Sequence, residues 1–153
     1  MWAKRAARDI MQLKEAGYKV RNAEGGEDLG NMSSFLVNMR APKDSAYEGF
    51  EYDILFTITE KFPFSSPSIG FKQRIYHPNV DEMSGSICLD SLNKTWSPAF
   101  TLVNIVEAQL PYLLQYPNPA DPFNREAAAR LARSKDEFKT FVQDHCSRYA
   151  RKA

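Results

Sequence analysis

The residues of this chain that could do chemistry lie together in one stretch without regular periodicity. From Gln73 to Ala99 the sequence has turn residues, aromatic residues and a cysteine, but no sustained helical or strand pattern. A long irregular stretch inside a compact domain is typical of a functional loop. Three motifs stand in it: Tyr76-His77-Pro78-Asn79-Val80, Gly85-Ser86-Ile87-Cys88-Leu89-Asp90 and Trp96-Ser97-Pro98-Ala99.

Cys88 is the candidate nucleophile of this stretch, because a thiolate attacks acyl carbon readily. Asn79 could donate its side-chain amide to the negative charge that develops on an acyl oxygen, or it could hold the loop by bonding backbone groups. His77 precedes a proline and is interpreted as structural, with proton transfer as the less favoured role. Cys146 lies in a helical pattern beside apolar residues, which predicts inert burial.

The composition of the chain is that of an ordinary globular domain. Of its 153 residues, 43% are hydrophobic and 25% are charged, which excludes a disordered, collagen-like or coiled-coil chain. The net charge of +1 indicates no general affinity for nucleic acid. With 2 cysteines there is no disulfide framework, and no apolar run is long enough to span a bilayer. The opening residues MWAKRAARDIMQ lack the apolar region of a signal peptide, so we expect a soluble protein in a reducing, intracellular setting.

The elements before the irregular stretch are predicted to be one helix and a small sheet. Apolar residues recur at helical spacing from Trp2 to Ala16, and Gly17 stands where a helix-ending glycine belongs. Alternating or β-prone patterns then predict short strands at Tyr18–Asn22, Met32–Met39, Phe50–Thr59 and Ser68–Phe71. The order predicts a four-stranded antiparallel meander.

Helices are predicted to resume after the irregular stretch. Thr101 can cap a helix that runs to about Gln115, in which Pro111 is expected to cause a kink or a break. A short alanine-rich helix is predicted over Asn124–Ala132, and Ser134 with Glu137 gives the capping-box signal for a last helix. The residues of that helix expected to face the core are Phe138, Phe141, Val142 and Tyr149. Together these elements predict one α+β domain.

Taken in order, the motifs resemble those of the ubiquitin-conjugating enzymes, the E2 family. The likeness covers nearly the whole chain: a basic first helix, a meander, Tyr47-Glu48-Gly49, Phe62-Pro63-Phe64, His77-Pro78-Asn79, Cys88-Leu89-Asp90, Trp96-Ser97-Pro98-Ala99 and Pro117-Asn118-Pro119-Ala120-Asp121-Pro122. The resemblance implies the E2 (UBC) fold, with an N-terminal helix, a four-stranded meander, a long active-site loop and C-terminal helices. It also implies that residues 1–153 form a single UBC catalytic core domain.

The resemblance implies a transferase in which Cys88 takes ubiquitin from the activating enzyme (E1) as a thioester. The acyl group then passes to a lysine amine or to a ligase cysteine. Asp121 matches the family position beside the acceptor lysine, where it would orient the amine, since a carboxylate alone raises the pKa of an amine. Asp90 is a further candidate contact of the acceptor. No cofactor of its own is implied, because ATP is used by the E1.

The implied partners are ubiquitin, the E1, a RING or HECT ligase (E3) and protein substrates. Two loops of the chain match those that receive ligases in the family, and the basic face of the first helix matches one shared by E1 and ligase. The implied partner residues are Lys4, Arg5, Arg8, Phe64, Pro98 and Ala99. We expect no nucleic-acid or membrane partner, no metal, a monomer, and a cytoplasmic location with the nucleus as a second one.

The choice of ligase stays open at this point. Eight residues separate Asn79 from Cys88, one more than in the commonest members, and Asp81–Gly85 carries the extra residue. This longer loop resembles the H-type branch, which is associated with CTLH/GID ligases, whereas Ser97-Pro98-Ala99 resembles the D-type. The closing residues, Arg148 to Lys152, are basic, unlike the acidic tail of the H-type branch.

Other functions remain as alternatives. A cysteine hydrolase could use Cys88 with His77 and Asn79, although Cys88 does not open a predicted helix that would lower its pKa. A non-catalytic module on the same fold would lack the cysteine. The spacing from Cys88 to Trp96 shows no insertion of the kind seen in SUMO-conjugating enzymes, so ubiquitin is favoured over another ubiquitin-like modifier.

Overall fold

A computed structural model describes residues 2–29, 33–87, 96–120 and 122–153 of the chain. Helix α1 comes first, and the strands follow it. The elements are α1 (Trp2–Glu15), β1 (Val20–Asn22), β2 (Ser34–Arg40), β3 (Phe50–Thr57), β4 (Ser68–Phe71), α3 (Leu102–Asn104), the π-helical turn η1 (Ile105–Gln109), α4 (Leu110–Gln115), α5 (Arg125–Arg133), α6 (Lys135–Tyr149) and β5 (Arg151–Lys152). The predicted helices and strands are therefore confirmed, with ends that differ by a few residues.

The sheet is the predicted antiparallel meander in the order β1-β2-β3-β4. Its register pairs Phe35 with Phe56 and Val37 with Ile54, so that apolar side chains of β2 and β3 lie on the same face. The alternation predicted for β3 is confirmed, because Phe50, Tyr52, Ile54 and Phe56 are all buried.

A fifth strand was not predicted. β5 pairs with the start of β3, where Phe50 lies opposite Lys152 and Glu51 opposite Arg151. The Arg151 guanidinium binds the nearly buried carboxylate of Asp53 at 2.7 Å. A strand of two residues has no readable period, so the sequence pattern could not indicate it.

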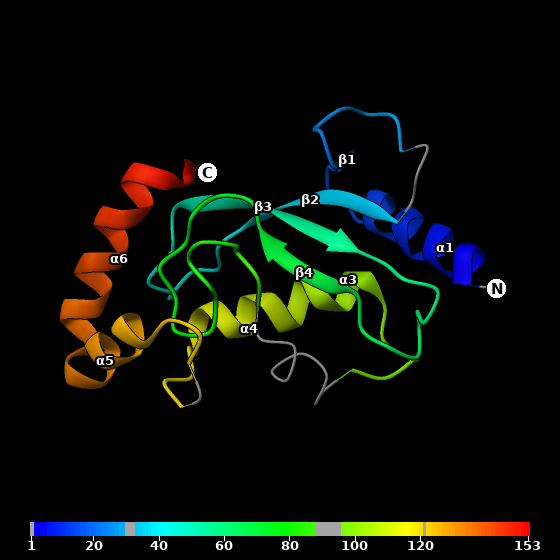
Figure 1. The fold of residues 1–153 in the computed structure, drawn as a ribbon. Helices are drawn as coiled ribbons and strands as arrows, with labels where there is room; N and C mark the ends of the chain where they lie inside the picture. The colour runs from blue at the N-terminus through cyan, green and yellow to red at the C-terminus, as the bar shows by residue number, and fades with distance from the viewer. Residues whose placement is uncertain (1, 30–32, 88–95, 121) are drawn as a thin grey trace.

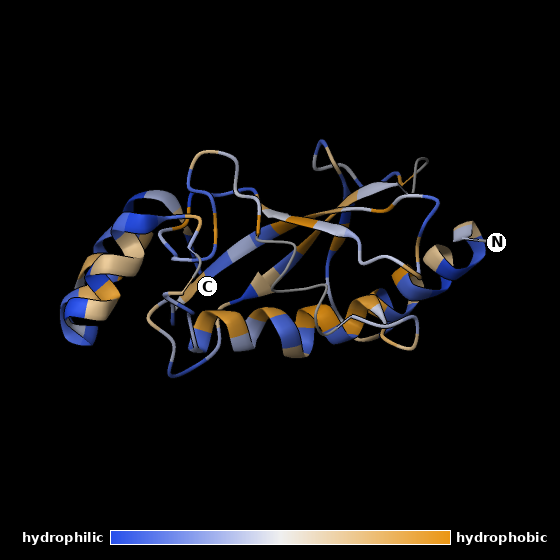
Figure 2. Cartoon of the chain, turned by 60° about the horizontal axis from the view of Figure 1, so that its bottom comes forward, coloured by the Kyte–Doolittle hydropathy of each residue, from blue (hydrophilic) through white to orange (hydrophobic). Residues whose placement is uncertain are grey.

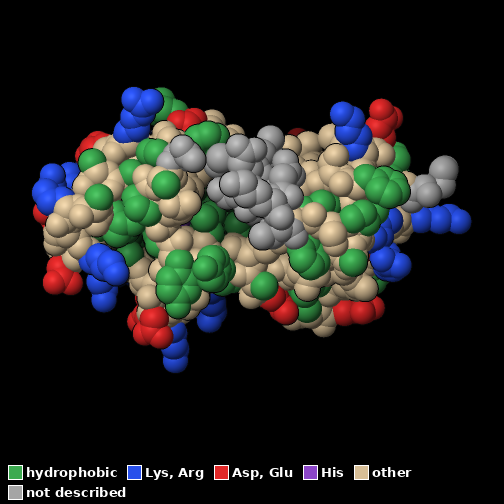
Figure 3. Space-filling model, turned by 90° about the horizontal axis from the view of Figure 1, so that it is seen from below, with side chains coloured by type: hydrophobic (Ala, Val, Ile, Leu, Met, Phe, Trp, Pro, Cys, Tyr) green, Lys and Arg blue, Asp and Glu red, His purple; other side chains and the backbone are tan. Residues whose placement is uncertain are grey.

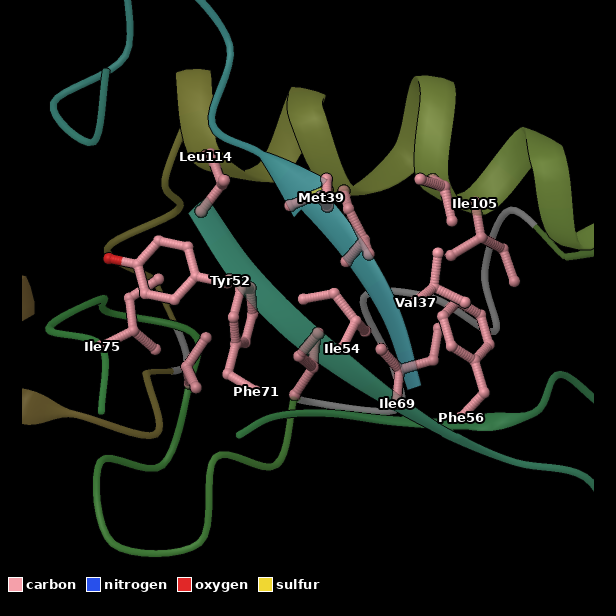
Figure 4. Packing of buried hydrophobic residues seen from close by; sticks show 14 of the residues in the cluster. Val37, Met39, Tyr52, Ile54, Phe56, Ile69, Phe71, Ile75, Ile105 and Leu114 are labelled. Carbon is pink, nitrogen blue, oxygen red and sulfur yellow. The ribbon is translucent and has the colours of Figure 1, made fainter. Parts of the chain in front are cut away.

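The consecutive elements α3, η1 and α4 form one long helix, which we call the central helix. It covers the apolar face of the sheet (Figure 1). Its buried residues include Ile105 and Leu114, which point at the strands among the side chains of Met39 and Ile54 (Figure 4). Figure 2 shows the apolar residues of this helix on the side that faces the sheet. Pro111 lacks a backbone donor, and the π-helical turn η1 interrupts the regular α-helix just before it, in the region where a kink or break was expected.

The remaining helices lie at opposite ends of the molecule, α1 at one and α5 with α6 at the other (Figure 1). Ser134 caps α6 through its side-chain oxygen, as predicted, and Asn124, predicted as the first residue of α5, caps that helix in the same way. Phe138 and Val142 enter the core, but the placement of Tyr149 there is wrong, because its side chain is 42% exposed. No helix of the described residues is long and apolar enough to cross a membrane.

Backbone hydrogen bonds fix the path of the irregular stretch. Isolated bridges join Gly70 to Ser86 and Val80 to Ile87, which places the stretch beside β4. Gly85 has a φ of +77° and donates a backbone hydrogen bond to Asp81. A Cβ on Gly85 would lie 2.1 Å from the Phe71 carbonyl oxygen, so this position requires glycine.

Candidate active site

His77 is buried in the irregular stretch and is bonded to backbone groups through both of its ring nitrogens. Its side chain is 0% exposed, Nε2 lies 2.9 Å from the Leu113 carbonyl oxygen, and Nδ1 accepts the backbone N–H of Asn79 at 2.9 Å. Burial lowers the pKa of His77 to about 4, although the bond to Leu113 raises it. The ring is therefore neutral at pH 7, with its proton on Nε2. Both nitrogens have partners, which fits the structural role predicted for His77.

Asn79 joins two loops that are far apart in the sequence. Its Nδ2 donates to the carbonyl oxygen of Asn118 at 2.8 Å, and its Oδ1 accepts the backbone N–H of Asn118 at 2.9 Å. The side chain is nearly fully buried. This paired contact is the loop-holding role weighed for Asn79 from the sequence. Because one Nδ2 hydrogen serves the carbonyl, the second can still be donated elsewhere.

The backbone around Pro78 strengthens the same junction. The Pro78 carbonyl oxygen accepts the N–H of Phe123 at 2.9 Å and that of Asn124 at 3.0 Å. The 118–124 segment is thus bound to the His77-Pro78-Asn79 motif at both of its ends. Asp121, the predicted acceptor-positioning residue, belongs to this segment but lies outside the described residues.

The chain leading to the candidate nucleophile is also fixed. Ile87 is 3% exposed, pairs with Val80, and donates its backbone N–H to the Ile69 carbonyl oxygen at 3.3 Å. Cys88 follows Ile87 directly in the sequence. Cys88 and Asp90 themselves lie outside the described residues, so their predicted roles remain predictions.

Cys146 has the surroundings of an inert thiol. It is 1% exposed inside the core, and its sulfur lies 3.2 Å from the hydroxyl of Tyr52. Burial raises the pKa of Cys146, although the hydrogen bond to Tyr52 lowers it. A buried thiol with a raised pKa supplies little thiolate, which agrees with the inert burial predicted for it.

The predicted ligase surface is exposed and apolar. Phe64 is 81% exposed, and Pro98 and Ala99 are also exposed. The indole of Trp96 links their two loops by donating to the Pro63 carbonyl oxygen at 2.8 Å. In the view from below, hydrophobic side chains lie across the middle of the face, and charged ones lie mainly around its rim (Figure 3). Exposed apolar side chains on a fixed scaffold are typical of a protein interface.

Arg5 has a structural role that the sequence did not predict, and Lys4 and Arg8 are exposed. The Arg5 guanidinium donates to the carbonyl oxygens of Pro98, at 2.8 Å, and Phe100. It also pairs with the buried Asp9 at 3.0 Å. Arg5 therefore holds the loop that carries Pro98 and Ala99, and its predicted contact with a partner stays a prediction.

Two site features were missed by sequence reasoning. Asn118 was quoted only within a proline-rich motif, yet its backbone completes the junction with Asn79. Asp9 was not singled out, although its carboxylate accepts the Leu102 N–H at 3.2 Å and so joins α1 to the central helix. An acidic residue on the apolar side of a predicted helix was the available signal for Asp9. Within the described residues no group of His, Cys, Asp and Glu could hold a metal ion.

Comparison with known proteins places this geometry in a family. The family model described as ubiquitin-conjugating enzyme matches residues 4–146. The chain is 50% identical to ubiquitin-conjugating enzyme E2-23 kDa of Triticum aestivum over 149 residues, which are 97% of this chain and 78% of that protein. It is 48% identical to ubiquitin-conjugating enzyme E2 5 of Arabidopsis thaliana, with the same shares covered.

The fold is shared with solved structures at lower identity. The E2 domain of a Toxoplasma gondii ubiquitin conjugating enzyme matches with a TM-score of 0.83 and 23% identity, over 97% of this chain and 99% of that one. This match confirms the predicted fold. The family model, the two plant relatives and the shared fold agree. The chain belongs to the ubiquitin-conjugating enzyme family.

Proposed function

We propose that the protein is an E2 that accepts ubiquitin from the E1 as a thioester on Cys88 and passes it, with a ligase, to a substrate lysine or a ligase cysteine. One observation supports this above the others. The His77-Pro78-Asn79 motif binds the 118–124 segment, and Val80 and Asp81, which follow it directly, bind Ile87 and Ser86 before Cys88. Together with family membership, these contacts mark the region where the transfer is proposed to occur.

The alternative of a cysteine hydrolase is not favoured. A hydrolase of the cysteine-histidine type needs an imidazole that accepts the thiol proton. Both nitrogens of His77 are already bonded inside the core, and burial lowers the pKa of His77 to about 4. His77 therefore lacks the free, basic nitrogen that this mechanism requires. Attack by an amine on a thioester needs no such base on the sulfur, because a thiolate leaves readily.

Asn79 is proposed to serve the transfer in two ways. Its paired bonds to Asn118 keep the two loops in register. Its remaining amide hydrogen is available for the acyl oxygen, where a positioned donor typically contributes about 100-fold or more in rate. Asp121 is proposed to orient the incoming amine, and Asp90 to contact the acceptor.

The division between Asn79 and Asp121 predicts different pH behaviour. Asp121→Ala should accept ubiquitin normally but discharge slowly to free lysine at pH 7, and should recover as the pH rises, because more amine is then deprotonated. Asn79→Ala should not recover, since alkali does not replace an oxyanion donor. Single-turnover discharge of purified thioester across a pH series measures both variants. The same pH profile in the two would mean that they act together on loop order.

The proposed partner surface consists of Phe64, Pro98 and Ala99, with Lys4 and Arg8 on the neighbouring face of α1. The exposure of these residues supports contacts with E1 and ligase. The loop before Cys88 and the Ser97-Pro98-Ala99 motif favour different ligase classes, CTLH/GID and the broader RING set respectively. A panel of purified ligases in a discharge assay distinguishes them.

The function is tested by incubation with E1, ubiquitin and ATP, followed by a non-reducing gel. The wild type and Cys146→Ala should form an adduct that a thiol reductant removes, because Cys146 is buried. Cys88→Ala should form none. An adduct that persists in Cys88→Ala and disappears in folded Cys146→Ala would overturn the assignment.

A further inference from the structure

His145 is a buried histidine that neither the transfer reaction nor the core explains. It lies on α6, is 8% exposed, and its Nε2 lies 3.3 Å from Oε1 of Glu82. Its Nδ1 is buried and has no hydrogen-bond partner among the described residues. Buried polar atoms almost always have partners, so an unpaired one calls for an explanation.

His145 belongs to a closed ring of four contacts, which we call the Glu82 cluster: Arg74, Glu82, His145 and Tyr149. Glu82 offers one carboxylate oxygen to His145 and the other to Arg74, at 3.3 Å each. The Arg74 guanidinium lies over the Tyr149 ring, 5.2 Å from its centroid, and the Tyr149 and His145 rings are 4.6 Å apart. These contacts also explain why Tyr149 lies outside the core.

The Glu82 cluster joins two parts of the chain that differ in role. His145 and Tyr149 belong to the last helix, which packs on the core through Phe138 and Val142. Glu82 belongs to Asp81–Gly85, the segment that carries the extra residue before Cys88. The same segment is closed by the Gly85–Asp81 backbone bond and continues directly to Ile87.

We propose that His145 is a positioning residue: through the Glu82 cluster it holds the 81–87 segment against α6 and so fixes the course of the chain into Cys88. This inference rests on the proposed role of Cys88. The geometry supports it because the carboxylate of Glu82 is the only group of its segment bonded to α6 in the described part of the chain. Misplacement of a reacting group by about 1 Å can cost roughly 100-fold in rate, so a remote hold of this kind affects transfer.

The Glu82 cluster depends on pH because His145 can take up a second proton. Burial lowers the pKa of His145, although Glu82 raises it, so the ring is neutral at pH 7 and its Nε2–H donates to Glu82. The groups that face the ring are Glu82 and Arg74 from the loop side, Tyr76 from the segment before it, and Asp144 and Tyr149 from α6. A second proton would sit on the buried, unpaired Nδ1. Because the pKa of His145 is lowered on folding, its contribution to the stability of the folded state is complete above about pH 6.5 and decreases below it, whereas the contact with Glu82, which raises the pKa, favours the protonated ring.

The contact itself is tested by NMR without any activity. The chain has 2 histidines, so the imidazole signals belong to His77 and His145 alone. Glu82→Gln should lower the pKa of His145, because the carboxylate charge is lost, and should shift the amide signals of residues 85–87. Arg133→Gln, which removes an ion pair with Glu137 near the start of α6, should do neither. An unchanged His145 titration in Glu82→Gln would overturn the proposal.

The positioning role is tested by single-turnover discharge of the ubiquitin thioester. His145→Phe and Glu82→Ala should each slow discharge by about three- to tenfold, below the cost of a full misplacement. The double variant should be no slower than the slower single variant, since both break one contact. His145→Gln, which restores an N–H donor at the same distance along the side chain, should recover most of the rate. Wild-type rates in His145→Phe, or losses that multiply in the double variant, contradict the role.

A separate readout keeps this inference distinct from the proposed function. If the wild type forms no thioester with E1, the proposed function fails. The alkylation rate of Cys88, followed by peptide mass, then still reports on the hold. His145→Phe and Glu82→Ala should change that rate in the same direction and by similar factors, while Arg133→Gln leaves it unchanged. Unequal or opposite changes overturn the positioning role.

Discussion

At the end of the molecule around His77 and Asn79, polar side chains are buried and bonded to backbone groups, whereas at the end around Phe64 and Pro98 apolar side chains are exposed. We call these the reactive end and the partner end. Buried amide and imidazole groups hold loops in one geometry, as a reaction requires. Exposed apolar groups on a fixed scaffold bind another protein. The two ends thus use side chains of opposite kind for the two tasks of a transfer enzyme.

The two ends have one feature in common: a polar side chain donates hydrogen bonds to backbone carbonyl oxygens of a loop. Asn79 does this for Asn118, and Arg5 does it for Pro98 and Phe100. The difference lies in what the held loops present to the outside. Variants that remove the supports should therefore damage each end separately.

The largest effect is expected from Asn79→Ala at the reactive end. The substitution leaves the backbone N–H and carbonyl of Asn118 without their partner, at about 1 to 2 kcal/mol each because Asn118 is exposed to water, so the free energy of unfolding should fall by about 2 to 4 kcal/mol. Urea unfolding measures this. Asn118→Ala is the matched control, because it keeps the two backbone bonds and should be close to wild type. Equal losses in both variants would show that the Asn118 side chain, and not the pairing, is the source of stability.

Lowering the pH from 7 to 4 should reduce the free energy of unfolding by an amount similar to, or somewhat smaller than, the effect of Asn79→Ala. The pKa of His77 falls to about 4 on folding, from an unfolded value near 6.5, so its contribution is complete above pH 6.5 and is lost as the pH falls through 4. The difference corresponds to about 3 kcal/mol. His145 acts in the same direction.

The measurement is urea unfolding at several pH values between 7 and 4. His77→Gln should be less stable than the wild type at pH 7 and should show a flatter pH dependence, because the titrating ring is gone. A variant that loses stability with acid as steeply as the wild type would contradict the assignment of this dependence to His77.

The sequence predicted interactions between residues that are close together in the chain, but not those between residues that are far apart in it. Thr101 and Ser134 cap helices that begin at the next residue, and the β3 alternation lies within one strand, so local patterns were sufficient. The Asn79–Asn118 bond spans 39 residues, and no local pattern indicates which backbone group an asparagine will meet. Arg5 was interpreted as a free surface cation because its helical face is basic, while its acceptors lie 93 and 95 residues away.

A smaller effect is expected from Arg5→Ala at the partner end. The loss of bonds to Pro98 and Phe100, together with the loss of the closer ion pair with Asp9, should lower the free energy of unfolding by about 2 kcal/mol. Ligase-stimulated discharge should weaken as the loop moves. Arg8→Ala is the control, since the Arg8 side chain is 61% exposed and lies at 3.8 Å from Asp9. Its unfolding curve should match the wild type within about 0.5 kcal/mol. A stability loss in Arg8→Ala as large as in Arg5→Ala would contradict the assigned role of Arg5.

The smallest effect on stability is expected from Phe64→Ala. The ring is 81% exposed, so its removal should change the free energy of unfolding by less than about 0.5 kcal/mol. Its effect on function should be confined to partner binding. Thermal unfolding and discharge of purified thioester without a ligase both check this, and a folded variant that discharges slowly on its own would place Phe64 in the reaction itself.

The separation of a reactive end from a partner end is tested most directly by single-turnover discharge of purified thioester to free lysine. Wild type, Phe64→Ala and Asn79→Ala are compared without a ligase, and again with a RING ligase that accelerates the wild type. Phe64→Ala should match the wild type alone and lose the acceleration, whereas Asn79→Ala should be slow in both settings. Unstimulated discharge that is as slow in Phe64→Ala as in Asn79→Ala would contradict this separation.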